Sequence, residues 1–138
     1  MGASVEHTAI LAKSELHLPA RRSELGAARD YAREGATAFG LDADTCHDFV
    51  CAVNEAVTNA IRHGAPDERG LIHLSIVADA DRLTFAVRDR GTFVMPVVDV
   101  AVSSDHGRGL ALMASLVDEV KLEIEPGGTT VRLSKARP

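Results

Sequence analysis

Two polar residues, Glu55 and Asn59, stand four positions apart in a segment whose composition otherwise favours a helix. Side chains at positions i and i+4 lie on one face of a helix, so a carboxylate and an amide would point into the same space. A carboxylate can act as a general base, and an amide oxygen can coordinate Mg²⁺. An exposed polar face would also explain the pair, although asparagine is a mediocre helix former. The chemistry therefore depends on what the rest of the chain places beside it.

A second polar motif, Asp89-Arg90-Gly91, lies at the end of a strand predicted over residues 83–89. A carboxylate at that position can accept a hydrogen bond from an exocyclic amine such as N6 of adenine. A glycine leaves room for a flat base to approach the backbone closely. Asp-x-Gly is also common in turns, and in isolation a strand-ending turn is the simpler interpretation.

Two glycine-containing motifs lie further along the chain. Gly107-Arg108-Gly109 opens a predicted helix, where free backbone N–H groups and the positive end of the helix dipole can bind phosphate. Gly128-Thr129-Thr130 enters the last predicted strand, where a threonine hydroxyl could bind a buried aspartate or a water beside a base. A flexible loop and a hairpin turn would explain the same two motifs without a ligand.

Apolar periodicity predicts the elements that must position these motifs. One helix is expected to end at Gly40, and the next is expected to start at Asp42 or Asp44 and to end at Gly64. The expected helices cover residues 22–39, 42–63 and 108–116, and the expected strands cover residues 9–18, 71–78, 83–89, 117–125 and 129–135.

The order of these elements is strand, two helices, hairpin, long loop, helix and hairpin. Strands grouped in hairpins with helices between them are typical of an α+β fold. We therefore expect a two-layer α/β sandwich with a mixed, mostly antiparallel sheet that helices cover on one face. Residues 91–107 show no clean period, and a connection of that length is usually a functional loop or lid.

Length and composition fit a single domain over residues 1–138, with 46% hydrophobic and 25% charged residues. The net charge of -5 argues against nucleic acid as a direct partner, because phosphate binding needs a basic face. No window approaches the roughly 18 apolar residues of a membrane span. The first residues lack a signal-peptide pattern, so we expect a cytoplasmic protein without a membrane partner.

Cys46 and Cys51 are the only cysteines of the chain. A spacing of five places them on different faces of one helix, where they are poorly placed to pair. Two cysteines that do not form a disulfide fit a protein of a reducing compartment. A metal set with His47 and His63 lacks a second Cys/His cluster to complete it, so we expect both cysteines to serve packing.

The four polar motifs, taken in their order along the chain, resemble the GHKL (histidine-kinase-like) ATPase superfamily. That superfamily includes gyrase-type ATPases, sensor histidine kinases and anti-sigma-factor serine kinases. The resemblance covers residues 17–135. The sequences Asn-Glu-Ala-Val-Thr-Asn-Ala-Ile-Arg-His-Gly at residues 54–64 and Leu-Ala-Leu-Met-Ala-Ser-Leu-Val-Asp-Glu-Val at residues 110–120 closely resemble the anti-sigma-factor serine/threonine-protein kinase family.

The resemblance implies that ATP and Mg²⁺ bind beside the helix at residues 42–63. Asn59 would coordinate the Mg²⁺ that bridges the ATP phosphates, and Glu55 would accept the proton of the attacking serine hydroxyl. His63 lies one turn beyond Asn59 and would border the phosphates. A histidine that merely interacts with the dipole at the helix end is the alternative.

The remaining nucleotide contacts are implied in the same way. Asp89 would bind adenine N6, with Gly91 beneath the ring and Thr130 near the adenine. The phosphates would be wrapped by Gly107, Arg108, Gly109 and Leu110.

The resemblance also implies an anti-sigma factor with ATP-dependent serine-protein kinase activity. Its substrate would be a STAS-type anti-sigma-factor antagonist, phosphorylated on serine, and its second partner an RNA polymerase sigma factor that it holds inactive. Arg29 falls where the family often places a partner-contacting arginine, and an exposed surface arginine is the equal alternative. The family commonly forms homodimers, which we expect here as well.

One departure from the family pattern is Phe93, where many relatives have a second glycine two residues after Gly91. The lid, about residues 92–106, would then be stiffer, or the adenine mouth would have a different shape. The alternative function is therefore an ATP-binding regulatory module that binds a protein partner without phosphotransfer. A sensor-histidine-kinase domain is disfavoured, because we expect no dimerisation helix with a phospho-acceptor histidine before it. A non-nucleotide α+β domain is the remaining alternative.

Overall fold

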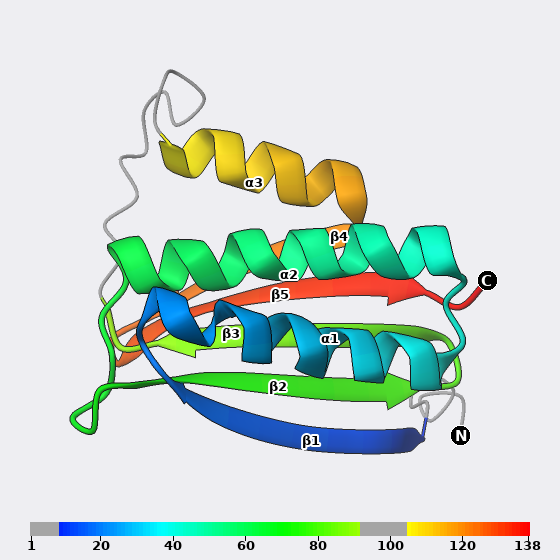
Figure 1. Cartoon of the computed structure of the whole chain (residues 1–138), viewed down its shortest axis with the longest axis horizontal. Helices are drawn as coiled ribbons and strands as arrows, with labels where there is room; N and C mark the ends of the chain where they lie inside the picture. The colour runs from blue at the N-terminus through cyan, green and yellow to red at the C-terminus, as the bar shows by residue number, and fades with distance from the viewer. Residues whose placement is uncertain (1–8, 92–104) are drawn as a thin grey trace, which may run out of the picture.

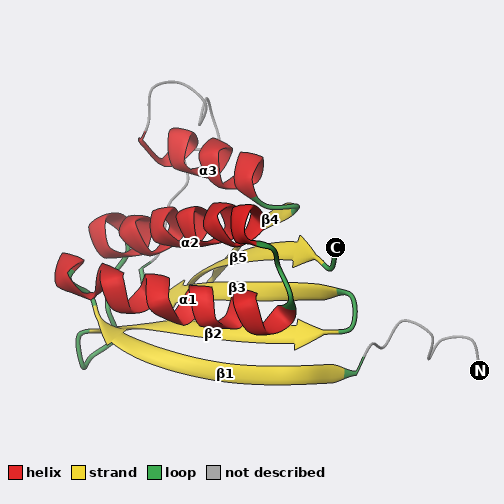
Figure 2. Ribbon diagram, turned by 45° about the vertical axis from the view of Figure 1, so that its right-hand side comes forward, coloured by secondary structure: helices red, strands yellow, loops and turns green. Residues whose placement is uncertain are grey.

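The protein folds into a sheet layer and a helix layer, which Figure 1 shows from one side. The computed structural model describes residues 9–91 and 105–138. One five-stranded sheet has the strand order β1-β2-β3-β5-β4. All described helices lie over the same face of that sheet, as Figure 2 shows from a second direction. The elements are β1 Ile10–Pro19, the 3-10 helix η2 Arg22–Glu24, α1 Leu25–Phe39, α2 Ala43–His63, β2 Leu71–Asp79, β3 Arg82–Asp89, α3 Asp105–Leu116, β4 Glu119–Glu125 and β5 Gly128–Ala136.

The end of α1 and both ends of α2 lie where the sequence places caps, whereas the expected helix start at residue 22 is the 3-10 helix η2 and α1 itself begins at Leu25. α1 ends at Gly40, which has the left-handed φ of 105° and donates its backbone N–H to Ala36 at 3.2 Å. α2 is capped at its N-terminus by Asp42, whose Oδ1 accepts a hydrogen bond from the backbone N–H of Thr45 at 2.8 Å. Of the two aspartates that could have capped this helix, Asp42 is the one that does so.

The core lies between the helices and the inner face of the sheet. α1 contributes the small side chains of Ala28, Ala32 and Ala36, which recur every four residues and let the helix approach β2 and β3 closely. Phe49 of α2 and Phe85 of β3 are both fully buried, and their rings meet edge to face at 6.4 Å between centroids. This packing holds α2 over β3 and β5, the strands that form the base of the candidate site.

The α+β sandwich is confirmed, and one detail of the expected sheet is wrong. Every pairing between the described strands is antiparallel, where we expected a mixed sheet. β4 and β3 both run antiparallel to β5, so β4 would form a parallel pair with β3 if the two strands lay directly side by side. β5 lies between them and prevents this contact.

The helix α3 also starts earlier than expected, at Asp105 instead of Arg108. It packs against α2 and β4, at the far side of the helix layer from α1. Phe93 and the rest of the expected lid up to residue 104 lie outside the described residues. None of the helices in the described ranges combines the length and the apolar character that crossing a membrane would require.

Candidate active site

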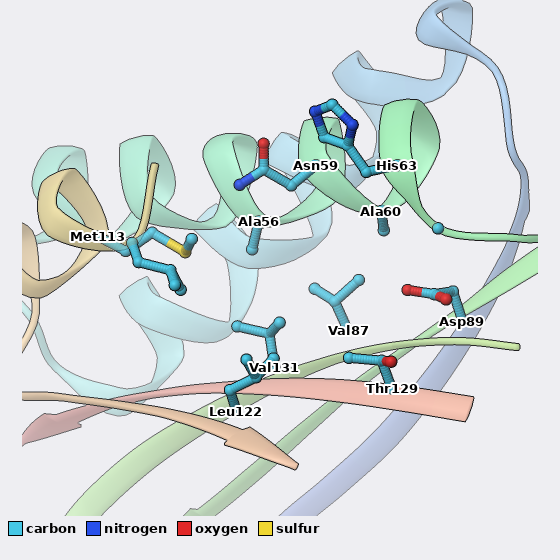
Figure 3. A pocket seen from close by; sticks show the side chains of 12 residues that line it. Ala56, Asn59, Ala60, His63, Val87, Asp89, Met113, Leu122, Thr129 and Val131 are labelled. Carbon is cyan, nitrogen blue, oxygen red and sulfur yellow. The ribbon is translucent and has the colours of Figure 1, made fainter. Parts of the chain in front are cut away.

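A cavity lies between α2, α3 and the inner face of the sheet (Figure 3). Its empty volume is about 510 Å³, including the open mouth. Ala56 and Ala60 point from α2 toward Val87 and Val131 of the sheet, and these small apolar groups leave a slot between the two layers. Asp89 lies at one end of the slot, and Met113 of α3 lies at the other. An apolar slot with one carboxylate at its end suits a flat heterocycle that carries a hydrogen-bond donor.

Asp89 is the buried carboxylate of this cavity, with 8% of its surface exposed. Its Oδ1 accepts hydrogen bonds from the backbone N–H groups of Gly91 at 2.6 Å and Ala65 at 3.3 Å. Burial raises the pKa of the Asp89 carboxyl above its usual value, and the two backbone hydrogen bonds oppose part of that rise. With Oδ1 committed to the backbone, Oδ2 remains as an acceptor on the other side of the group.

Two glycines allow the backbone to close around Asp89. A Cβ added at Gly64 would stand 2.5 Å from Oδ2 of Asp89 and 2.7 Å from the carbonyl oxygen of Ala60. A Cβ added at Gly91 would stand 2.9 Å from Oδ1 of Asp89 and from the backbone nitrogen of Ala65. Real Cβ atoms do not approach other atoms so closely. Both positions therefore need glycine so that the backbone can contact Asp89, in addition to any role in ending a helix or a strand.

The threonine that lines this cavity is Thr129, whereas Thr130, which we expected near the adenine, is not among the lining residues. Thr129 pairs with Asp89 in the β3–β5 register and lines the cavity, and its Oγ1 donates to the carbonyl oxygen of Gly91 at 2.9 Å. Successive strand residues point to opposite faces of a sheet. Thr130 therefore lies on the outer face, beside Arg88 and Arg132.

Glu55 and Asn59 lie on the side of α2 that faces α3, and the backbone of Gly109 packs directly against both. A Cβ added at Gly109 would stand 2.7 Å from Nδ2 of Asn59 and 3.2 Å from Oε1 of Glu55. The sequence motifs around residues 55–59 and 107–109 therefore meet in space. Asn59 also lines the cavity, while Glu55 lies one turn earlier on the same face.

The other predicted residues lie in three places. His63 and Leu110 line the cavity, and His63 comes from the last turn of α2. Gly107 and Arg108 lie inside α3, where we expected the helix to begin after Gly107. Arg29 lies away from the cavity, where its Nη1 donates to Oδ1 of Asn54 at 2.9 Å and ties α1 to α2 next to Glu55.

Sequence reasoning did not select several residues that the structure brings to this site. Gly64 and Ala65 contact Asp89 from a segment read only as a helix end. Thr129 could have been found by counting back from the apolar positions of the last strand, because every second residue shares the core face. Met113 and Leu122 belong to the apolar periodicity of their elements, which gives no sign of a cavity.

The polar side chains on the α2 side of the cavity suit a cation that is held mainly by the phosphates of a bound nucleotide. No group of three or more His, Cys, Asp or Glu side chains within residues 9–91 and 105–138 could hold a metal ion by itself. Asn59 offers one amide oxygen, which fits Mg²⁺, because this ion usually keeps several waters and binds substrate phosphates with only one or two protein ligands.

The sheet, the helix layer and the cavity between them define a nucleotide-binding domain of the histidine kinase type. The chain belongs to the histidine kinase-like ATPase domain family, whose model matches residues 18–135. This membership confirms the expected superfamily.

The similar proteins include serine kinases and anti-sigma factors. Serine-protein kinase RsbW of Bacillus velezensis is 32% identical over 134 residues, which cover 88% of this chain and 83% of that protein. Anti-sigma F factor of Geobacillus stearothermophilus is 32% identical over 139 residues, which cover 90% of this chain and 93% of that protein. These names confirm the expected resemblance to anti-sigma-factor serine kinases.

Two solved structures agree with the fold. The RsbU and RsbW domains of Rv1364c from Mycobacterium tuberculosis match with a TM-score of 0.67 and 27% identity, over 91% of this chain and 33% of that one. A histidine kinase domain from Erythrobacter litoralis EL346 matches with a TM-score of 0.55 and 20% identity, over 82% of this chain and 61% of that one. The second likeness concerns the fold alone.

Proposed function

We propose that this protein is an anti-sigma factor with ATP-dependent serine-protein kinase activity. The observation that supports this best is that three elements distant in the sequence, α2, the end of β3 and α3, meet at one cavity. Asp89 ends the apolar slot, Asn59 lines its helix side, and Glu55 lies one turn away against Gly109. An adenine site, a metal ligand and a general base are the parts that phosphoryl transfer to a hydroxyl requires.

In this proposal Asp89 selects the base. The exocyclic N6–H of adenine would donate to Oδ2, the oxygen that the backbone N–H groups of Gly91 and Ala65 do not use. The ring would lie in the slot between Ala60 and Val87, with Met113 at its far end. Burial of the ring in this slot excludes water from the hydrogen bond and strengthens it.

Glu55 would accept the proton of the substrate serine. The serine oxygen forms a bond to the γ-phosphorus while the bond from that phosphorus to the β,γ-bridging oxygen breaks, and ADP leaves. Mg²⁺, held by Asn59 and the phosphates, would neutralise the charge that develops on the phosphate oxygens. Gly109 would keep the backbone of α3 close to both side chains, so that nothing larger than a hydrogen separates them from the phosphates.

The partners follow from the same proposal. The phosphorylated protein would be a STAS-type anti-sigma-factor antagonist, and the sequestered protein an RNA polymerase sigma factor. Because both partners would act in the control of transcription, the protein would work in the cytoplasm. Arg29 would contact a partner near Glu55, and a homodimer would be the working assembly. The hydrogen bond from Arg29 to Asn54, the neighbour of Glu55, supports a role near the transfer site.

The test is a transfer reaction with purified components. The protein is mixed with Mg-ATP and, one at a time, with the STAS proteins encoded in the same genome, and intact mass is measured. We expect one phosphate on one antagonist and none when its acceptor serine is replaced by alanine. Persistent ATP binding with no transfer to any antagonist would refute the kinase and would leave an ATP-binding module.

A further inference from the structure

The outer face of the sheet, which no described helix covers, has a polar hollow above β1, β2, β3 and β5. We call it the open-face hollow. Ser75, Ala86 and Thr130 form its base, and longer side chains surround them. It lies on the opposite side of β5 from the nucleotide cavity, because Thr129 lines that cavity and Thr130 lines the hollow. The surrounding side chains are Glu15, His17, His73, Arg88 and Arg132.

Thr130 is the unusual residue of this hollow, because it is buried and its hydroxyl has no partner among residues 9–91 and 105–138. Only 5% of Thr130 is exposed, and no side-chain hydrogen bond reaches it from the described residues. The other buried polar side chains of the described chain are satisfied: Thr129 by Gly91, Ser134 by Thr84, and Asp89 by two backbone N–H groups. Buried hydroxyls normally have partners, so an unpaired one at the base of a hollow is available to donate to a group that binds there.

The charges around the hollow indicate the kind of ligand. Nε of Arg132 donates to Oε1 of Glu123 at 2.9 Å, and Nη1 of Arg88 lies 3.9 Å from Oε1 of Glu125. A guanidinium has five N–H donors, so each arginine retains donors beyond this one contact. Arginine donors with a hydroxyl between them suit the oxygens of a carboxylate or a phosphate.

The side of the hollow nearest β1 is held by two histidines. The rings of His17 and His73 stack with centroids 4.1 Å apart, and Nε2 of His73 lies 2.7 Å from Oδ2 of Asp67. Glu15 is the acidic residue of the lining, and its Oε1 lies 3.7 Å from Nε2 of His17. This carboxylate sits at the β1 side, so an anion would bind toward Arg88 and Arg132.

We propose that the open-face hollow binds one oxyanion of the carboxylate or phosphate class. The hydroxyl of Thr130 donates to it from below, and Arg88 and Arg132 donate from the rim. The oxyanion can come from a free small molecule or from an acidic side chain of a second copy of this chain, and the chemistry at Thr130 is the same in both cases. The site is independent of the nucleotide cavity and of the proposed kinase activity.

The test is a titration of the full-length ¹⁵N-labelled protein with sodium phosphate and with sodium acetate, each against sodium chloride at equal ionic strength. We expect saturable shifts of the Thr130 and Ser75 amides with at least one of the two oxyanions and none with chloride. The variants Thr130→Val and Arg132→Gln should weaken binding by about tenfold, the loss expected for one charge-assisted hydrogen bond.

Matched variants keep the test decisive. Ser134→Ala removes a hydroxyl from the same strand and face, and Arg82→Gln removes an arginine paired with Glu119 on the same face; both should bind like the wild type. Thr130→Ser retains the hydroxyl and should restore binding if Thr130→Val is destabilised. Equal affinities of Thr130→Val, Thr130→Ser and the wild type, or shifts no larger than those with chloride, would overturn the proposal.

Oligomeric state separates the two sources of the oxyanion. If a second copy supplies a carboxylate, phosphate competes with it, and light scattering should show a dimer that phosphate or Thr130→Val dissociates. If the ligand is a free anion, the shifts should saturate while the molecular mass stays constant. Each result supports the oxyanion site and assigns its occupant.

Discussion

The two sides of the nucleotide cavity are built differently. The strand-end wall, formed by Gly64, Asp89, Gly91 and Thr129, is tied together by hydrogen bonds to the backbone. The helix wall, formed by Glu55, Asn59 and Gly109, consists of half-buried polar side chains against one backbone segment. A wall fixed by backbone bonds can select a base without rearranging. A wall of side chains can exchange its contacts with phosphates and a metal, as transfer requires.

Glu55→Gln should have the largest effect, because it should impair the function of the helix wall and leave that of the strand-end wall intact. The amide cannot accept the serine proton, so phosphotransfer should fall by about 10²- to 10⁴-fold while ATP affinity stays within a few-fold. Single-turnover assays and calorimetry measure the two quantities. Asp48→Asn, at an exposed position of the same helix, should leave both unchanged. Equal rates of phosphotransfer by Glu55→Gln and the wild type would show that Glu55 is not the catalytic base.

Asp89→Asn should affect the strand-end wall next most strongly. The backbone N–H groups of Gly91 and Ala65 would hold the amide oxygen, so the NH₂ group would face N6 of adenine, donor against donor. ATP affinity should fall by about 10- to 100-fold. The affinity for GTP should fall less or should rise, because O6 of guanine can accept a hydrogen bond from the new NH₂ group. Calorimetric titration with both nucleotides tests this, and unchanged discrimination between them would exclude Asp89 as the base selector.

Gly109→Ala should disturb the helix wall more moderately. The added Cβ would stand 2.7 Å from Nδ2 of Asn59, so the side chain or α3 must shift. We expect Mg-ATP affinity to fall by about tenfold. Gly26→Ala is the matched control at another helical glycine, because its nearest atom is the end of Arg29 at 3.8 Å, and it should be stabilising by about 0.5–1 kcal/mol. Wild-type affinity in Gly109→Ala would contradict the close contact.

The smallest expected effects are pH-dependent, and they have opposite signs at two aspartates. The hydrogen bond from His73, helped by the backbone N–H groups of Leu71 and Arg69, lowers the pKa of Asp67 from 3.8 to about 2. Its stabilisation is complete above pH 3.8 and is lost as the pH falls toward about 2, because the unfolded state then binds more protons. Burial raises the pKa of Asp89, so its folded state holds the proton more tightly and stability falls as the pH rises above 3.8.

Urea unfolding between pH 2 and 6 measures both effects, with the usual carboxyl pKa of about 4 inside that range. In the wild type, Asp67 makes the free energy of unfolding rise with pH and Asp89 makes it fall with pH. Asp67→Asn should therefore remove part of the rise, and Asp89→Asn should remove the opposing fall. Matching slopes in Asp67→Asn and the wild type would show that the contact with His73 does not persist in solution.

The elements could be predicted because their signals are local. Apolar periodicity and the stops at Gly40 and Gly64 place helices and strands within a few residues of the observed bounds. The mixed sheet was a wrong expectation, since the insertion of β5 beside β3 depends on packing over long sequence distances. The start of α3 at Asp105 was missed because the glycines at 107 and 109 were read as a helix boundary.

The site could be predicted where its chemistry follows from spacing within one element. Glu55 and Asn59 share a helix face at any tertiary arrangement, and Asp89 ends its strand regardless of neighbours. The sequence pointed to Thr130, while the structure places its neighbour Thr129 in the cavity lining, because one residue reverses the face of a strand. The contact of Gly109 with both helix residues was beyond sequence reasoning, because it depends on the distance between α2 and α3.

The most direct test of the two-walled site is to observe both walls in one titration. Mg-ADP is added to the ¹⁵N-labelled protein, and the backbone amides of Gly64, Gly91 and Gly109 are followed by NMR. The account predicts that all three shift together with one affinity and that Asp89→Asn weakens the shifts at Gly109 as much as those at Gly91. Shifts confined to one wall, or different affinities at the two walls, would contradict it.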